Sequence, residues 1–480
     1  MENNINLIKE LSNKIVEENM ITQTKIKIDS EELSIFYIES LIDKKLFSSS
    51  ILSPIEKIKK DLKGSQDTIF QNIKNSISVS NLIECSDLHQ IETNLLSGFA
   101  IILFPNKAIC CPIFGVEKRS IQEPPSARVL KGPREGFVEE INTNIGLIRK
   151  RIKSFDLKIK TSHVGMRSKT QISIVYMENI ARDNVIKQVE KIINSINIDA
   201  VIDSYYITTF LEGRKIKIFK RIGNTEKPDI FCAKLLEGRV GILVDGSPLA
   251  LTVPFLLIED LQSAGDYYST PAVASFSRML RFFGLVISIL IPAVYVSLQS
   301  YNYRILPINF LITILSSIEG LSIPPLLEIL VVLFLFEIIS EASVRMPNAL
   351  GMALSIIGAL ALGNTAVDAG IISPPSIVIV AISSVAIHII PDQFDATRLL
   401  RIIFTLIGGI IGLYGVFISS IFLLTYLCSI ESFGVPYLVP YSPTIKKDKK
   451  DGFIMKPIQD MKYRPISIAG KNKVRQGKRK

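Results

Sequence analysis

Long apolar runs fill the second half of the chain, whereas apolar and polar residues alternate over about the first 280 residues. Four stretches of 22, 22, 23 and 29 residues carry no charged side chain: Phe282–Tyr303, Met346–Val367, Ala369–Pro391 and Ile402–Ile430. A helix of about 20 apolar residues crosses the hydrocarbon core of a bilayer. The pattern therefore predicts an α-helical, polytopic membrane bundle over residues 282–430, preceded by a large soluble region.

Two shorter apolar segments leave the number of crossings open. Ile305–Ile318 has only 14 residues, and Leu326–Ser340 contains two glutamates. If both ends of the chain are cytoplasmic, the number is even, so both six crossings and four crossings with two re-entrant segments fit. Basic loop residues favour the cytoplasm, but six crossings place Arg345, Arg398 and Arg401 on the opposite side.

Shorter patterns before residue 250 alternate between strand and helix types. Apolar residues alternate over Gln171–Tyr176 and form a continuous run over Val240–Val244, as in half-buried and buried strands. Between them, the apolar residues of Asn184–Ile196 recur every three or four positions, which predicts a helix with one apolar face. Asp245 and Gly246 then predict a hairpin turn. Strand, helix and strand in this order favour an α/β sandwich.

The predicted organisation has six parts. They are a mobile lead (1–30), two cytoplasmic α/β subdomains (31–153 and 154–249), a membrane-surface linker (250–281), the helical bundle of four to six crossings (282–430) and a basic, disordered cytoplasmic tail (431–480). The first residues lack a basic segment followed by an apolar one. We therefore expect no cleaved signal peptide and a cytoplasmic N-terminal region.

The net charge of +10 comes from the last 40 residues. Residues 441–480 hold 13 basic and three acidic side chains, which leaves 42 of each sign in the rest of the chain. A polybasic segment directly after the last span is typical of a tail retained in the cytoplasm beside anionic lipid. A nucleic-acid contact is the alternative, and the position of the segment favours lipid.

The residue types needed for catalysis do not form a pattern. The five cysteines lack metal-ligand spacing and the three histidines do not cluster. The sequence contains no phosphate-binding loop, dinucleotide fingerprint, nucleophile elbow or HExxH motif. We therefore expect neither an enzyme nor a bound cofactor or metal.

Acidic residues occur within one of the apolar segments. Glu337, Glu341 and Arg345 recur every four residues, so a helix would place them in one row. Ionisable groups inside a membrane are costly and usually face a polar interior. An internal salt-bridge ladder and an acidic wall for cations both explain this row, and both interpretations stay open.

A stripe of small and weakly polar residues runs along another segment. At helical spacing, one face of this segment carries Gly351, Ser355, Gly358, Leu362 and Thr365. Small residues allow helices to pack closely. The same face also suits a pore in which Leu362 forms an apolar constriction. From the residues alone, close packing is the simpler interpretation.

Two long motifs have a distinctive sequence. Residues 128–151 read RVLKGPREGFVEEINTNIGLIRKR, and residues 236–281 contain GR, VDGSP, DYY and a final RMLR. They resemble the signature of the A subunits of spore germinant receptors, the GerA family, and the similarity covers about residues 30–440. The motif positions to which we assign structural roles are Gly132, Pro133, Arg134, Asp245, Gly246, Pro248, Arg278 and Arg281.

The resemblance implies a function in the inner membrane of the dormant spore. Such A subunits act with a transporter-like B subunit, which binds the nutrient, and with a lipoprotein C subunit. An oligomer, with a pentamer implied, would form a nutrient-gated channel whose release of monovalent cations triggers germination. On this resemblance the small-residue stripe becomes the candidate pore face. A non-conducting scaffold or signal-transducing subunit, and the accessory stage V sporulation AF-type relative, are the alternatives.

Overall fold

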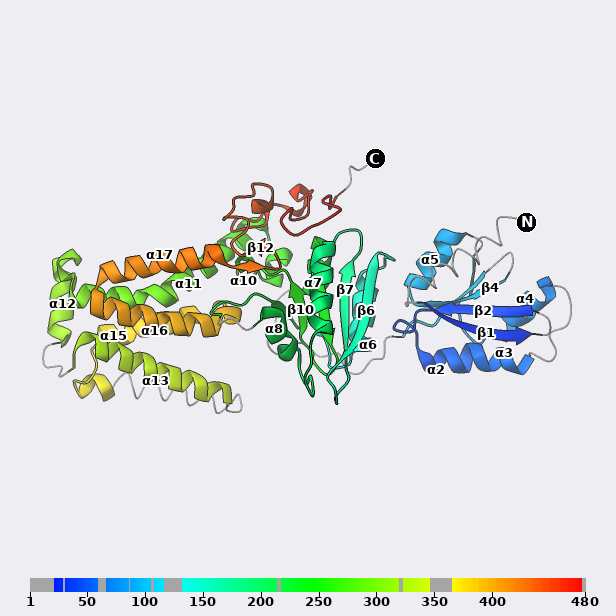
Figure 1. The fold of residues 1–480 in the computed structure, drawn as a ribbon, viewed down its shortest axis with the longest axis horizontal. Helices are drawn as coiled ribbons and strands as arrows, with labels where there is room; N and C mark the ends of the chain where they lie inside the picture. Colours follow the sequence, from blue (N-terminus) through cyan, green and yellow to red (C-terminus); the bar gives the residue numbers. More distant parts are fainter. Residues whose placement is uncertain are drawn as a thin grey trace. The chain divides into compact units, whose positions relative to one another are not determined.

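The computed structural model describes residues 21–28, 31–58, 66–85, 87–104, 108–115, 132–213, 217–318, 323–345 and 365–476 (Figure 1). The chain divides into two compact units. Unit 1 comprises Met1–Lys215, Ile222–Pro254 and Lys462–Lys480, and unit 2 comprises Ile216–Arg221 and Phe255–Met461.

The first sheet of unit 1 has five antiparallel strands in the order β1-β2-β4-β5-β3. Their bounds are Thr22–Ile28 (β1), Glu31–Tyr37 (β2), Ile83–Cys85 (β3), Phe99–Leu103 (β4) and Ala108–Pro112 (β5). Figure 1 shows helices on both faces, with α5 (Leu88–Leu96) on one and α2 (Lys44–Phe47) and α3 (Ser53–Ile58) on the other. Ile101 and Ile102 accordingly belong to different apolar clusters. Burial on both faces explains why β4 is a continuous apolar run.

The second sheet of unit 1 is also antiparallel, in the order β6-β7-β9-β10-β8. Its strands are Leu157–Val164 (β6), Thr170–Met177 (β7), Gly223–Thr225 (β8), Val240–Val244 (β9) and Ala250–Val253 (β10). The predicted hairpin is confirmed, because β9 pairs with β10 and Gly246 adopts a φ of +83° that favours glycine. The prediction that the linker begins at residue 250 is wrong, since β10 occupies Ala250–Val253. Its apolar residues are buried in the sheet and do not lie on a membrane surface.

Four helices accompany the second sheet. Their bounds are Ile141–Arg151 (α6), Asp183–Asn194 (α7), Ser204–Glu212 (α8) and Pro228–Glu237 (α9). The predicted helix Asn184–Ile196 corresponds to α7, whose Val185, Val189 and Ile193 are buried. The two sheets and their helices give unit 1 the predicted α/β class.

Unit 2 is helical. Its helices are Leu257–Asp260 (α10), Pro271–Ser300 (α11), Ile308–Ile318 (α12), Pro325–Arg345 (α13), Pro374–Ile387 (α15), Phe394–Ile411 (α16) and Leu413–Ser429 (α17). In Figure 1, α11, α16 and α17 run side by side. The uncharged run Ile402–Ile430, which we predicted as one span, is divided between α16 and α17. Gly412 separates them with a φ of +77°, a conformation that interrupts a helix.

Among the described residues, α11 is the one helix that is long and apolar enough to cross a membrane by itself. A second span results if α15 and the helical segment Pro391–Ile411, which meet at a bend of 109°, are counted together. α13 is also long, but its 21 residues include three glutamates and an arginine. The predicted four to six crossings therefore stay a prediction.

The segment after α17 has a defined structure up to residue 476, so the prediction of a disordered tail is wrong for residues 431–476. In unit 1, Gly470 N donates to Ile180 O at 2.8 Å, and Arg464 Nε donates to Leu236 O at 2.7 Å. The prediction rested on charge alone. Order arises because both the backbone and the basic side chains of the segment find hydrogen-bond partners.

Candidate functional site

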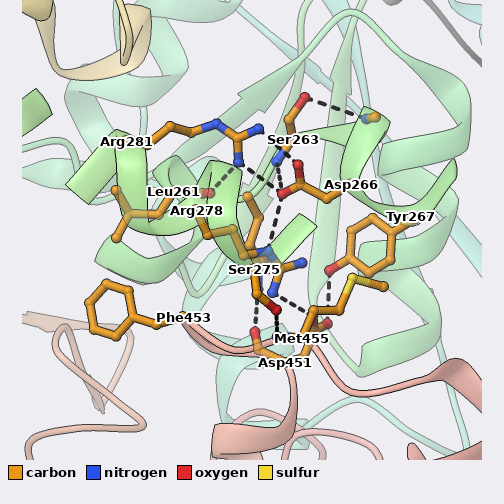
Figure 2. A network of polar contacts seen from close by, with 12 residues as sticks. Leu261, Ser263, Asp266, Tyr267, Ser275, Arg278, Arg281, Asp451, Phe453 and Met455 are labelled. Atoms are coloured by element: carbon orange, nitrogen blue, oxygen red, sulfur yellow. Dashed lines mark hydrogen bonds and ion pairs between the residues drawn. The ribbon is translucent and has the colours of Figure 1, made fainter. Parts of the chain in front are cut away.

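Asp266 is the centre of a buried network at the start of α11 (Figure 2). It lies in the short 3₁₀ helix Ala264–Tyr268 and is 3% exposed. Arg281 donates to both carboxylate oxygens at 2.8 Å, and Arg278 Nε donates to Oδ2 at 3.1 Å. The contact with Arg281 is bidentate, a geometry that strengthens an arginine–carboxylate pair.

Arg278 extends this network to the C-terminal part of unit 2. Its Nη1 donates to Asp451 Oδ1 at 2.8 Å and to Gly452 O at 2.7 Å, while the Tyr267 hydroxyl donates to Asp451 Oδ2 at 2.8 Å. Arg278 is fully buried. We call Asp266, Arg278, Arg281 and Asp451 the α11 network, because they join the start of α11 to a segment far along the chain.

The electrostatics of the α11 network favour an ionised Asp266. Burial by itself raises the pKa of this carboxyl, but hydrogen bonds from Arg281, Ser263 N–H and Arg278, together with the charge of Arg281, outweigh burial. The pKa of Asp266 therefore lies below its ordinary value, so this carboxyl group is ionised at neutral pH.

A second ion-paired network lies among the helices. Glu337 of α13 contacts Arg398 Nε at 2.5 Å and also pairs with Arg401, both from α16. Glu341 Oε1 accepts from Arg345 Nη2 at 2.8 Å and Glu341 Oε2 lies 3.8 Å from Arg398 Nη1. We call these five residues the α13–α16 network.

Arg401 ties the α13–α16 network to two more helices. Its Nη1 donates to Ser383 Oγ at 3.1 Å and to Ser384 Oγ at 3.2 Å, both on α15. Ser383 Oγ in turn donates to Ser288 O of α11 at 2.8 Å. Arg401 is 2% exposed, and its Nε has no hydrogen-bond partner among the described residues.

The charges of this network bear on the two interpretations of the acidic row. The i,i+4 pair between Glu341 and Arg345 is present, as a ladder requires, whereas Glu337 pairs with arginines of another helix. Three arginines face two glutamates, so the network carries an excess positive charge. The geometry therefore gives Glu337 a helix-joining position and not that of a free acid facing cations.

The stripe of small residues falls mostly outside the described part of the chain. This applies to Gly351, Ser355, Gly358 and Leu362. Thr365 is described: it is exposed and begins a helical turn in which its carbonyl accepts from Ala369 N at 3.0 Å. In the part of the chain that the structure describes, no group of three or more His, Cys, Asp or Glu side chains could hold a metal.

Comparison with known proteins identifies the family. The model of the Bacillus/Clostridium GerA spore germination protein family matches residues 6–467. The chain belongs to this family.

Several relatives are similar over most of their length. Spore germination protein KA of Bacillus subtilis (strain 168) is 34% identical, over 95% of this chain and 84% of its own. Spore germination protein GerQA of Bacillus cereus is 30% identical, over 99% of this chain and 95% of its own. A solved structure of the N-terminal domain of the A subunit of the Bacillus megaterium spore germinant receptor GerK3 is 26% identical, over 52% of this chain and 94% of that domain, with a TM-score of 0.40.

The GerA signature positions of unit 1 meet around the start of α6. Asp245 Oδ1 accepts from Ile141 N at 3.2 Å, and Gly246 N donates to Glu139 O at 2.8 Å. The carbonyl of Pro133 accepts from Lys227 Nζ, a fully buried ammonium group, at 2.9 Å. These contacts fix backbone segments to one another, as expected of structural positions.

The remaining signature positions differ in their surroundings. Gly132 and Arg134 are exposed, Pro248 is half-buried, and Arg278 and Arg281 belong to the α11 network. The structure therefore brings Arg278 and Arg281 together with acids that the sequence analysis did not select.

Sequence reasoning missed Asp266 and Asp451. Asp266 lies inside the quoted DYY motif, and two arginines three residues apart near an apolar helix require a nearby acid if they are buried. That requirement could have identified Asp266. No local signal identifies Asp451, because its partner Arg278 lies 173 positions away.

Proposed function

We propose that this chain is the A subunit of a nutrient-sensing spore germination receptor and that, as an oligomer, it forms a nutrient-gated cation channel in the inner spore membrane. Membership of the GerA spore germination family supports the role in germination. The observation that carries the channel proposal is the α13–α16 network. Its acids are occupied by arginines, so the uncharged small-residue face of residues 351–365 is the better lining for a cation path.

The proposed topology is multi-pass, with four to six crossings and with the N-terminal region and the C-terminal tail in the cytoplasm. Arg345, Arg398 and Arg401 appeared to contradict this orientation when only the sequence was considered. Arg398 and Arg401 are paired with Glu337, and Arg345 is paired with Glu341, so none of them is a free loop charge of the kind that sets orientation. The pairing therefore supports the orientation given by the basic tail.

The proposed partners follow from the family. They are a transporter-like B subunit, a lipoprotein C subunit and further copies of this chain, in a pentamer. Exposed lysines of the tail, among them Lys446, Lys447 and Lys456, suit contact with anionic lipid.

The test of conduction replaces the bulky residue of the proposed pore face. Leu362→Ala removes the apolar constriction, so we expect cation flux without nutrient from vesicles that hold the complete receptor complex. Leu315→Ala is a matched control, because Leu315 on α12 is 52% exposed and lies outside the proposed face. If parent and Leu362→Ala complexes are both silent to cation current, the channel proposal is wrong.

A non-conducting, signal-transducing subunit is the second candidate. The α11 network favours it, because it couples the first apolar helix to the C-terminal segment. This candidate predicts nutrient-dependent germination with no cation current in the reconstituted complex. The accessory AF-type relative is distinguished by its gene neighbourhood, since adjacent genes for a permease-like protein and a lipoprotein favour a receptor A subunit.

A further inference from the structure

A second acid of α13 is buried without a basic partner. Glu328 lies in the first turn of this helix and is 1% exposed. The next residue, Ile329, belongs to a buried apolar cluster that also includes Val332 and Ile372. Among the described residues, no lysine, arginine or histidine pairs with Glu328, in contrast to Glu337. A carboxylate in such a place needs other groups that stabilise its charge.

The start of α15 supplies those groups. Ser373 is the N-cap residue of α15, and its N–H and hydroxyl donate to Glu328 Oε1 at 2.7 and 2.6 Å. Ser376 Oγ lies 2.9 Å from Ser373 Oγ, and both serines are fully buried. The Ser373 hydroxyl makes no capping bond within its own helix. The carboxyl group of α13 thus accepts from the N–H of the N-cap residue, as an N3 glutamate does in a capping box, next to the positive end of α15.

The same contacts fix the connection that precedes α15. The helical turn that begins at Thr365 ends near Gly370, and the N–H groups of Ile371 and Ile372 donate to Ala366 O at 3.0 and 3.3 Å. Ile372 is 3% exposed and belongs to the same apolar cluster as Ile329. Residues 365–373 are therefore fixed to α13 at the end where they join α15.

α11 contributes one more polar group. Tyr295 is 7% exposed, and its side chain interacts electrostatically with Glu328 and lies close to Ser373 and Ser376. Its hydroxyl has no well-formed hydrogen bond among the described residues. Three helices thus converge on the carboxylate of Glu328.

We infer that Glu328 is a positioning residue whose carboxyl group caps α15 from a neighbouring helix and holds the Thr365–Ser376 connection against α13. The inference rests on the proposed function in one respect, namely that this connection directly follows the segment assigned to the pore face. Loss of the carboxylate then frees the connection and raises cation release without nutrient.

The experiment compares variants of the full-length chain in its receptor complex. Glu328→Ala removes the cap, Glu328→Gln keeps an acceptor without the charge, and Ser373→Asp in the Glu328→Ala background returns a carboxylate to the same helix end. Leu327→Ala is the matched control, because Leu327 is the neighbour of Glu328 on the same helix, is 50% exposed and belongs to neither network. Hydrogen exchange of residues 371–378 and cation release without nutrient are the two measurements.

We expect Glu328→Ala to accelerate exchange of these amides about tenfold, Glu328→Gln to have a smaller effect, and Ser373→Asp to restore most of the protection. Leu327→Ala should match the parent. Parent-like exchange in Glu328→Ala, or no recovery with Ser373→Asp, overturns the inference. If Glu328→Ala does not assemble, Glu328→Gln and the Ser373→Asp double variant carry the same test.

The two proposals fail in different ways. If Leu362→Ala releases cations while Glu328→Ala exchanges as the parent does, the capping role is wrong and the channel stands. If exchange rises in Glu328→Ala but neither variant releases cations, the capping role stands and the channel is wrong.

Discussion

The α11 network and the α13–α16 network differ in how their charges are balanced. In the α11 network two arginines face two aspartates, and the carbonyls of Leu261 and Gly452 accept further guanidinium N–H groups. In the α13–α16 network three arginines face two glutamates, and the hydroxyls of two serines accept from the most buried arginine.

This difference separates two roles for buried arginine. A balanced network that uses backbone carbonyls joins a loop and a chain segment to one helix end. A network with excess charge, made almost entirely of side chains on helices, depends on the relative placement of those helices. The second network is therefore the one that a movement of α13 against α16 would disturb first.

The largest expected effect is the loss of Arg401. Arg401→Leu removes the most buried guanidinium of the α13–α16 network and leaves Glu337 with Arg398 alone, so we expect the free energy of unfolding of the full-length protein in detergent to fall by about 3–5 kcal/mol. Removing both charges, with Glu337→Leu added, should recover part of this loss. Equal denaturation midpoints for the parent and Arg401→Leu would show that the α13–α16 network does not stabilise the bundle.

Asp266→Asn should lower the free energy of unfolding by about 2–3 kcal/mol, because the buried Arg278 and the half-buried Arg281 lose their shared anion. We expect faster hydrogen exchange of residues 451–456, which Arg278 holds against α11. Asp460→Asn is the control, since Asp460 is exposed. Unchanged protection of residues 451–456 in Asp266→Asn contradicts the proposed joining role.

Two neighbouring aspartates predict opposite pH dependences. Burial raises the pKa of Asp260 to about 7, although the charge of Lys220 and a hydrogen bond from Gln393 act in the other direction. The protonated Asp260 carboxyl stabilises the fold, and this contribution is fully present when the pH is below the ordinary pKa of 3.8. The contribution is lost as the pH rises through about 7. Ionised Asp266, whose pKa is lowered in the fold, stabilises the fold at neutral pH. This contribution is lost only as the pH falls below the ordinary pKa of an aspartate.

Asp260→Asn separates the two contributions. Since Asp260 is partly exposed, we expect the variant to be more stable than the parent by about 1–2 kcal/mol at pH near 8 and to match the parent at pH near 4. Denaturation midpoints measured across this range provide the check. A stability difference between parent and Asp260→Asn that stays the same at both pH values would show that the pKa of Asp260 is not raised.

The smallest expected effect concerns the exposed edge of the α13–α16 network. Arg345 is 78% exposed on its side chain and pairs with Glu341 one turn earlier. Arg345→Gln should lower the free energy of unfolding by less than about 0.5 kcal/mol, because exposed i,i+4 ion pairs contribute little to stability. A loss of stability as large as that of Arg401→Leu would mean that the network acts as one unit. The burial of each arginine would then not determine how much it contributes.

Local patterns predicted the elements whose cause is local. The alternation of Gln171–Tyr176 and the turn at Asp245 and Gly246 correspond to β7 and to the β9–β10 hairpin. α11 begins at Pro271, well before the long uncharged run that starts at Phe282. Its two arginines can be buried in a helix because acids elsewhere in the chain neutralise them, and no local pattern contains that information.

The candidate site depends on distant partners and was therefore predicted only in part. Glu337 was selected from the sequence, but its arginine partners were interpreted as loop charges. Glu328 was noted only as an interruption of an apolar segment, although it caps a helix 45 positions later in the chain. The order of the tail likewise follows from partners in other parts of the chain.

Cation flux through the reconstituted receptor tests the central claim most directly. Vesicles that hold the complete complex with the parent chain should release monovalent cations only when nutrient is added. Vesicles that hold the Leu362→Ala complex should release them without nutrient. The Leu315→Ala control should behave as the parent. If the parent and Leu362→Ala complexes both bind nutrient and neither passes a cation current, the account is wrong.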